Sequence, residues 1–188
     1  MDRSLILAWM LVLCTAMAPA CCQGYYSHSV PYVPSPEKVT HLHFFLHDTM
    51  SGKNASAVTV ARPNMTTAFS NTPAPFGSVL AVDDPITLGP DLTSEIIGNA
   101  QGLWVSTGQD VPSLVVYLDF GFTQGKFNGS SFSVFSRNPI TQKKRELAVV
   151  GGRGKFRMAT GFAQLKTYFG NITSGDAIVE YNVTLIHH

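Results

Sequence analysis

The chain has 188 residues, of which 45% are hydrophobic and only 13% are charged. That length suits one domain, and so much apolar content excludes an intrinsically disordered protein, because burial can offset the entropy lost on folding. Lysine and arginine number 13 against 12 aspartate and glutamate residues, a formal net charge of +1. A nucleic-acid-binding protein normally carries a basic excess, which is absent here.

Residues 1–22 have the features of a secretory signal peptide. Arg3 provides the positive charge, Leu5–Met17 is apolar, and Ala18-Pro19-Ala20 offers the small residues that a signal peptidase prefers. The apolar stretch is shorter than the roughly 20 residues that span a bilayer. The alternative is an uncleaved anchor, but we expect cleavage, a secreted protein and no membrane partner.

Sequence features of the remaining chain agree with export. All three cysteines lie at positions 14, 21 and 22, so the body must be stabilised by core burial and hydrogen bonds rather than by an internal disulfide. The acceptor pattern for N-glycosylation, Asn-x-Ser/Thr with x not Pro, occurs five times and predicts a glycosylated exterior. The acceptor residues are Asn54, Asn64, Asn128, Asn171 and Asn182.

Residues 23–38 carry prolines and tyrosines without periodicity and are predicted to form a flexible N-terminal arm. From residue 39 to the end the apolar residues recur with period two, and no long helical pattern appears. About eight or nine strands with short Gly-, Pro-, Asn- or Asp-containing connections predict an antiparallel sheet that closes into a barrel or splits into a sandwich. The predicted strands are 39–48, 57–61, 77–82, 96–107, 113–122, 130–136, 145–150, 155–166 and 177–186.

The alternation predicts which side chains face the interior. A glycan on Asn182 must face water, so Tyr181 and its neighbours of the same parity should face inward. Asp48 shares the parity of Phe44 in the first strand, where an acid at the end of an apolar face would have a raised pKa and could transfer protons. The alternative is that Asp48 caps the turn that follows it.

Two further positions are candidates for a cavity. Arg145 has the parity of the apolar Leu147 and would need a carboxylate or an anionic ligand if it were buried; the alternative is a surface charge. Tyr117 and Asp119 share one side of a strand whose two sides are both half apolar. The sequence does not decide which side faces the cavity, and two apolar sides would also suit a strand that packs against another subunit.

Two other groups of residues are weaker candidates for a functional site. His41, His43 and His47 share a strand face, but a polar outer face explains them better than a zinc site does. The glycine-rich segment 151–156 lacks the Ser or Thr that follows the lysine of a P-loop, so we interpret it as a turn. We expect no metal and no cofactor.

Several segments together resemble the plant dirigent protein family. They are Phe44–Asp48, Asn99–Gly102, Phe127–Ser131, Arg145–Phe156, Met158–Ala163 and Asp176–Leu185. The resemblance implies an all-β fold, an eight-stranded antiparallel β-barrel of the allene-oxide-cyclase type over 39–188, which assembles as a trimer or dimer in the apoplast. It also implies a small phenolic partner, either a monolignol radical or a quinone methide.

The resemblance implies a function that orients reactive phenolics. A separate oxidase such as laccase makes phenoxy radicals from monolignols such as coniferyl alcohol, and the barrel directs their stereoselective coupling to lignans without oxidative activity of its own. Asp48 and Arg145 match the family's cavity acid and arginine and are the candidate catalytic residues. Phe44, Tyr117, Asp119 and Tyr181 are the candidate substrate contacts.

The chain departs from the pattern of the lignan-forming members of the family, which favours a resemblance to other members. Lignan-forming members carry a second cavity Asp where this chain has Arg137-Asn138. The sequences of two segments, Phe135–Pro139 and Gly151–Phe156, resemble those of pterocarpan synthases more closely. These enzymes dehydrate an isoflavanol through a quinone methide and are therefore carbon–oxygen lyases. A third alternative is a protein of cell-wall lignin patterning or defence.

Overall fold

The computed structural model of the chain describes residues 26–33, 35–64 and 71–188. The predicted signal peptide and all three cysteines lie outside the described residues. The chain divides into two units, 1–33 and 34–188. In the first, residues 26–33 have no regular secondary structure and exposed side chains. In the second, the first strand begins at Lys38.

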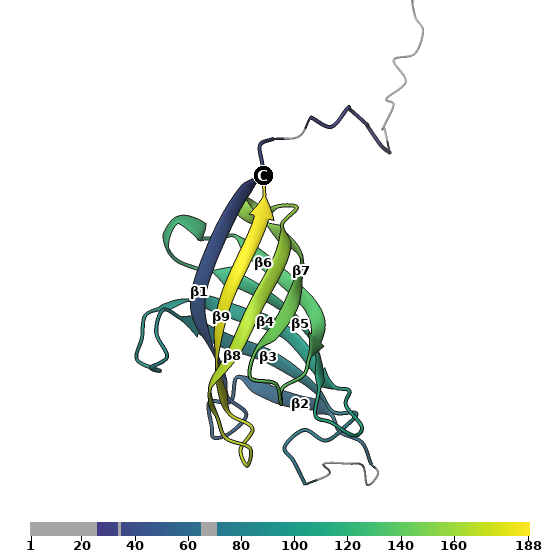
Figure 1. Cartoon of the computed structure of the whole chain (residues 1–188), viewed down its shortest axis with the longest axis vertical. Coiled ribbons are helices and arrows are strands. Elements are labelled where there is room, and N and C mark those ends of the chain that lie inside the picture. Colours follow the sequence, from purple (N-terminus) through teal and green to yellow (C-terminus); the bar gives the residue numbers. More distant parts are fainter. Residues whose placement is uncertain (1–25, 34, 65–70) are drawn as a thin grey trace, which may run out of the picture. The chain divides into compact units, whose positions relative to one another are not determined.

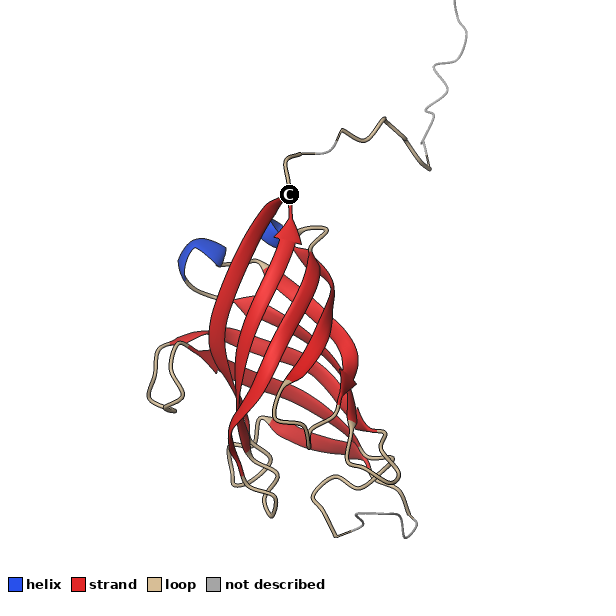
Figure 2. Cartoon of the chain, in the orientation of Figure 1, coloured by secondary structure: helices blue, strands red, loops and turns tan. Residues whose placement is uncertain are grey.

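The second unit is a closed antiparallel barrel, as the sequence predicted (Figures 1 and 2). Eight strands follow one another in the order β1-β9-β8-β7-β6-β5-β4-β3, and β1 pairs with β3 to complete the circle. The short strand β2 adds to β3 as a ninth strand. The strands are β1 (Lys38–Asp48), β2 (Ala57–Ala61), β3 (Val79–Thr87), β4 (Ile96–Ser106), β5 (Leu114–Phe122), β6 (Ser131–Asn138), β7 (Arg145–Arg153), β8 (Thr160–Gly170) and β9 (Ala177–His187).

The strands that differ most from the predictions are β3, β7 and β8. β3 continues through Asp83-Asp84-Pro85, beyond its predicted end at residue 82, although these residue types are typical of a turn. Pro85 is tolerated because this part of β3 lies between its pairing with β2 and its pairing with β1, where the missing N–H has no ladder partner to lose. β7 likewise includes Gly151-Gly152-Arg153, and β8 begins only at Thr160, after the short 3₁₀ turn η2 (Gly154–Phe156).

Aromatic side chains fill one end of the barrel. Phe120 stacks on Phe132 with ring centroids 4.9 Å apart, and Phe44 stacks on Tyr181 at 5.4 Å. Phe156 of η2 covers this cluster from the end of the barrel, next to the matching turn η1 (Gly125–Phe127). Fully burying each phenylalanine contributes about 1.5–3 kcal/mol, so this aromatic plug is a major source of the stability of the barrel.

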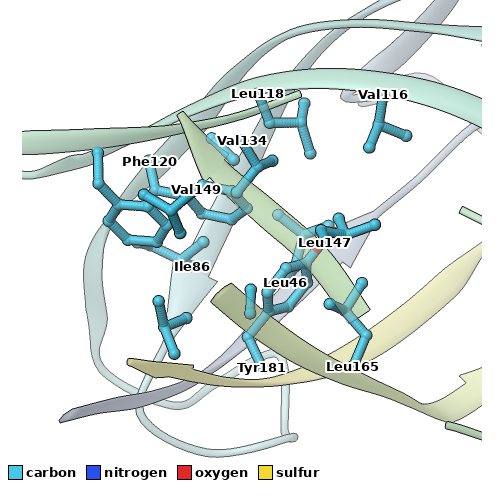
Figure 3. Close-up of a cluster of buried hydrophobic side chains, with 14 of the residues drawn as sticks. Leu46, Ile86, Val116, Leu118, Phe120, Val134, Leu147, Val149, Leu165 and Tyr181 are labelled. Atoms are coloured by element: carbon cyan, nitrogen blue, oxygen red, sulfur yellow. The ribbon is translucent and has the colours of Figure 1, made fainter. Parts of the chain in front are cut away.

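Smaller side chains line the other end of the barrel. Leu46, Val116, Leu118 and Leu165 point inward there, beside Tyr181 (Figure 3). Leucine and valine reach less far across a barrel than phenylalanine does, so the strands enclose space at this end. None of the helices in the described part of the chain has the length and apolar character of a transmembrane segment.

One glycine tests how closely the strands approach. Gly161 in β8 has φ +139°, and a Cβ there would lie 2.0 Å from the backbone oxygen of Thr184 in β9. We expect Gly161→Ala to lower the free energy of unfolding by roughly 3 kcal/mol, because backbone cannot yield as a flexible side chain can. Urea unfolding measures the change. Gly151→Ala in β7, where nothing lies within 4 Å, is the control; equal stability of both variants would contradict the prediction.

Candidate functional site

A cavity of about 800 Å³ opens at the end of the barrel opposite the aromatic plug. Its walls are mostly apolar, with a few polar groups among them, which is the usual composition of a site for a small organic molecule. The polar and aromatic side chains that face it include Asp48, Asp84, Trp104, Asn138, Arg145, Thr167 and Tyr181.

Asp48 and Asp84 lie opposite each other in this cavity. β1 pairs with β3 through Phe45↔Thr87 and Leu46↔Ile86, and continuing this antiparallel register by two residues brings Asp48 to Asp84. Asp84 is buried, and Ser56 Oγ donates a hydrogen bond to its Oδ1 at 2.6 Å. Asp48 Oδ1 is also shielded from solvent and has no hydrogen-bond partner among the described residues.

Burial makes both carboxyl groups weak acids. The pKa of Asp84 is raised to about 8, first by burial and then by the neighbouring charge of Asp48, against the lowering effect of the Ser56 hydrogen bond. The pKa of Asp48 is raised to about 6, first by burial and also by the charge of Asp176, against the lowering effect of the Trp104 indole. The indole N–H does not complete a hydrogen bond in the described part of the chain. Near neutral pH the pair therefore holds about one proton, mainly on Asp84.

Arg145 stands in the same cavity as a buried cation. Its Nη1 donates to Asn138 Oδ1 at 3.2 Å and its Nη2 donates to Thr167 Oγ1 at 2.7 Å. Both acceptors are neutral, and no carboxylate oxygen of the described residues lies within 4.0 Å of the guanidinium. Burial lowers the pKa of Arg145, and Tyr181 counteracts this shift. Of Arg137 and Asn138, where the resemblance implies a second cavity acid in other members, Asn138 lines the cavity and Arg137 does not.

The expected inward direction of three residues agrees with the geometry. Asp48, Arg145 and Tyr181 all line the cavity. Tyr181 is fully buried, and burial strongly raises the pKa of its hydroxyl, so the phenol stays neutral. Their roles in catalysis and binding remain proposals.

Asp176, and not Asp48, caps the turn after β1. Its Oδ1 accepts hydrogen bonds from the backbone N–H groups of Met50 at 2.8 Å and Ser51 at 3.0 Å. Its Oδ2 accepts from the hydroxyls of Ser51 and Ser174. These donors lower the pKa of Asp176 and join two loops at the cavity mouth. The alternative role for Asp48, a turn cap, is therefore wrong.

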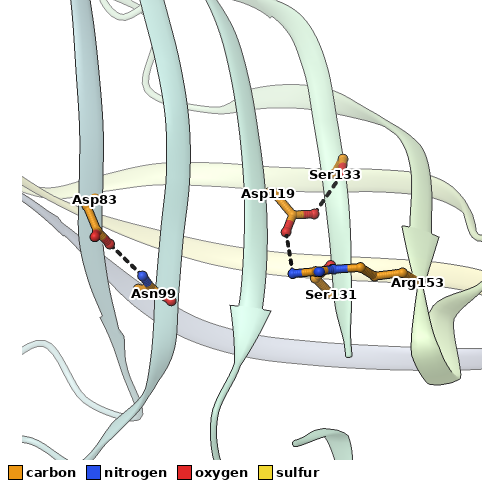
Figure 4. A network of polar contacts seen from close by, with 6 residues as sticks. All are labelled: Asp83, Asn99, Asp119, Ser131, Ser133 and Arg153. Atoms are coloured by element: carbon orange, nitrogen blue, oxygen red, sulfur yellow. Dashed lines mark hydrogen bonds and ion pairs between the residues drawn. The ribbon is translucent and has the colours of Figure 1, made fainter. Parts of the chain in front are cut away.

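Three candidate substrate contacts lie elsewhere. Tyr117 is 43% exposed on the outer face of β5, because Val116, Leu118 and Phe120 take the inward positions. Asp119 is on the same outer face, where it accepts a hydrogen bond from Ser133 and pairs with Arg153 (Figure 4). Phe44 belongs to the aromatic plug and does not line the cavity. The period-two alternation of β1 correctly predicted that Phe44 faces the interior, but it could not show at which end of the barrel Phe44 lies.

Sequence reasoning missed Asp84. The triplet Asp83-Asp84-Pro85 has the composition of a turn, and this masked a usable signal: Asp84 shares the parity of the buried Leu80, Val82 and Ile86. The same argument that identified Asp48 would have identified it. Trp104 was also missed, although its large ring faces the cavity beside Asp48.

The histidines of β1 do not share one environment. His41 and His43 hydrogen-bond Thr184 and Glu180 on the outer face. His47 is buried and hydrogen-bonds Thr87, and burial lowers its pKa. The described residues contain no group of three or more His, Cys, Asp or Glu side chains that could hold a metal ion.

The predicted glycosylation sites are accessible to an exterior modification. All five acceptor asparagines have exposed side chains. Asn171 lies on the rim of the cavity, whereas Asn182 is on the outer face of β9.

The chain is similar to known proteins in both sequence and fold. The family model described as "Dirigent-like protein" matches residues 39–186. Dirigent protein 15 of Arabidopsis thaliana is 46% identical over 192 residues, with full coverage of both chains. Pterocarpan synthase 1 of Glycyrrhiza echinata is 44% identical over 87% of each chain. A solved structure of a pterocarpan synthase dirigent protein has a TM-score of 0.81 and 43% identity, covering 87% of this chain and 99% of that one.

The buried acid pair predicts how stability depends on pH. An unfolded aspartate ionises near pH 4, whereas Asp84 in the folded protein holds its proton to about pH 8. The folded state therefore binds more protons in this range, and stability falls as pH rises, by up to about 1.4 kcal/mol per pH unit. The lowered pKa of His47 gives an opposite slope, which ends about one pH unit above 6.5, where the unfolded histidine has also lost its proton.

Urea unfolding between pH 7.5 and 8.5 measures this slope. Asp84→Asn keeps an acceptor for Ser56 and removes the titrating group, so its stability should be nearly flat over that range. A wild-type protein that gains stability toward pH 8.5 would show that the pair is not buried as described.

Proposed function

The chain belongs to the dirigent family, and from this premise we propose that its cavity closes a ring in a phenolic alcohol through a quinone methide. The activity is that of a pterocarpan synthase, with an isoflavanol as the substrate class. Relatives at 44% identity that carry this name support the proposal. The observation that carries it is the Asp48–Asp84 pair, two coupled carboxyls of unequal pKa in one cavity.

The reaction is a loss of water with ring closure, and the pair can supply each proton transfer. Asp84, which is protonated at neutral pH, gives a proton to the benzylic hydroxyl as the carbon–oxygen bond breaks and water leaves. Asp48, which is largely ionised, takes the proton of the conjugated phenol, so that a neutral quinone methide forms. An internal phenol then adds to the methide carbon. Its proton returns to Asp84, and Asp48 returns a proton to the ring oxygen, which restores both groups.

The other cavity residues favour this dehydration and ring closure in two ways: by positive charge and by excluding water. The Arg145 guanidinium stabilises negative charge that develops on the phenolic oxygen during the first step. The apolar walls formed by Leu46, Val116 and Leu165 limit water, which would otherwise add to the methide carbon. Holding the internal nucleophile near that carbon supplies the orientation that sets the handedness of the product.

Stereoselective coupling of monolignol radicals is a second candidate function. The volume of the cavity, about 800 Å³, favours it, because sites for drug-sized ligands span roughly 300–1,000 Å³ and two small phenolics need the larger part of that range. In this case the barrel would orient radicals that a separate oxidase such as laccase generates. Product analysis with coniferyl alcohol and an oxidase distinguishes the two functions.

We further propose the setting that the sequence predicts. The protein is exported to the apoplast, carries glycans on its exposed acceptor asparagines and works as a homo-oligomer. Apolar side chains on the outer face of β2, β4, β5 and β6 offer a surface for another copy; they are Val58, Val60, Leu103, Tyr117 and Phe135.

The acid pair predicts the effect of substitutions on turnover. We expect Asp48→Asn and Asp84→Asn each to reduce dehydration of an isoflavanol by about 10²–10⁴-fold, because each removes one proton-transfer group. In the wild type, kcat/KM should rise with pH near 6 and fall near 8, in line with the two pKa values. Chiral chromatography of the product, without any oxidant, measures both effects.

The control for these variants is Asp119→Asn. It removes a carboxyl of the outer face that pairs with Arg153 and should leave turnover unchanged. Full turnover by both cavity variants, with intact folding by circular dichroism, would exclude proton transfer by the pair. An enantiomeric excess from coniferyl alcohol in the absence of isoflavanol turnover would favour the second candidate function.

A further inference from the structure

The charge of Arg145 is unusual because the protein does not neutralise it locally. The side chain is 6% exposed, its two hydrogen-bond acceptors in the described residues are the amide oxygen of Asn138 and the hydroxyl of Thr167, and its buried Nε has no partner there. Buried arginines are normally paired with a carboxylate, because an uncompensated charge in a low-dielectric interior is costly. A guanidinium keeps its proton even when burial lowers its pKa, since the ordinary value exceeds 12.

The other ionisable groups around the cavity do not replace this missing counter-ion. The acids that face it are Asp48 from β1, Asp84 from β3 and Asp176 from the loop after β8, and none lies within 4.0 Å of Arg145. Asp176 is already occupied by four donors at the mouth. The remaining groups are the neutral phenol of Tyr181 and the cations Lys143 and Lys166.

The cavity therefore becomes positively charged in mildly acidic solution. At pH 5 Asp48 and Asp84 are mostly protonated, because their pKa values are raised. Asp176, whose pKa is lowered by its donors, stays ionised at the mouth, but the cations of the lining outnumber it. A ligand carboxyl that ionises at roughly pH 4, as Asp and Glu do, is an anion under the same conditions. Such a carboxylate can accept a hydrogen bond from the guanidinium and also supply the missing negative charge, whereas a neutral alcohol can only accept the hydrogen bond.

We propose that Arg145 is an anion-binding subsite inside the barrel, and that it makes the cavity prefer phenolic carboxylates, of the hydroxycinnamate class, over the corresponding neutral alcohols. Asn138 is the residue that determines this preference, because an acid in its place would neutralise Arg145 from within the protein. The inference goes beyond the proposed ring closure: it names a second ligand class for the same cavity, and it requires binding but no turnover.

A matched pair of ligands tests the inference. Ferulate and coniferyl alcohol share one phenol ring and differ in the end of the side chain, a carboxylate in the first and a hydroxymethyl group in the second. Isothermal titration of the full-length secreted protein at pH 5.0 should give a Kd about tenfold lower for ferulate, the effect of one charge-assisted hydrogen bond.

Substitution at Asn138 identifies the cause of the preference. Asn138→Asp is nearly isosteric and places a carboxylate where the amide oxygen now accepts from Nη1 at 3.2 Å, so the two ligands should bind with similar affinity. Lys126→Gln, at the plugged end, changes the net charge by the same amount outside the cavity and should keep the tenfold preference. If Asn138→Asp does not fold, Arg145→Met removes the cation instead and should also abolish the preference.

Three results would overturn the inference. They are equal affinities in the wild type, a preference that persists in Asn138→Asp or Arg145→Met, and no detectable binding of ferulate by the wild type. A preference that Lys126→Gln also removes would mean diffuse attraction and would overturn it as well. Ferulate binding without isoflavanol turnover would count against the proposed function alone, and turnover without a ferulate preference would count against the anion subsite alone.

Discussion

The antiparallel closure between β1 and β3 is the interaction on which the rest of the site depends. The two strands share only the pairs Phe45↔Thr87 and Leu46↔Ile86, yet this short contact turns an open sheet into a barrel. It also brings two acids from distant parts of the chain to one wall of the interior. Because neither carboxyl can ionise there without cost, closure itself produces an acid and a base of unequal strength. The same burial that makes the pair useful in proton transfer also makes the folded protein less stable at alkaline pH.

The interior is divided between two kinds of packing. Aromatic rings from β1, β5, β6 and η2 pack together at one end, and the end with the polar groups is lined by leucine and valine side chains that leave a cavity. This division explains how a small domain with no cysteine after residue 22 can contain a large hollow. The plug contributes the stability, and the open end can then hold groups that cost stability, including Asp84 and Arg145.

The barrel is shared with the relatives of this chain, whereas the polar groups on the cavity walls can differ among them. The chain shares its fold with pterocarpan synthases and is 44% identical to one of them over 87% of each chain, so the scaffold is common to them. What distinguishes one cavity from another is then the set of polar groups on its walls. In this chain the neutral Asn138 beside Arg145 leaves a positive charge without a local counter-ion. A single side chain of that kind can change which ligand charge the cavity accepts while the barrel stays the same.

The β class, most strand positions and the inward faces of β1, β7 and β9 follow from the amino-acid order alone, because alternation with period two is a local property of each strand. Asp48, Arg145 and Tyr181 were found in this way. Tertiary structure decided the rest. It showed that Asp83-Asp84-Pro85 belongs to a strand, since the gap between two pairing partners that tolerates Pro85 exists only in the closed barrel. Tertiary structure also decided that Tyr117 and Asp119 face outward and that Phe44 lies in the plug. The parity of a residue gives the face of the strand on which it lies. It gives neither the depth of that residue along the barrel nor the neighbours that closure brings to it.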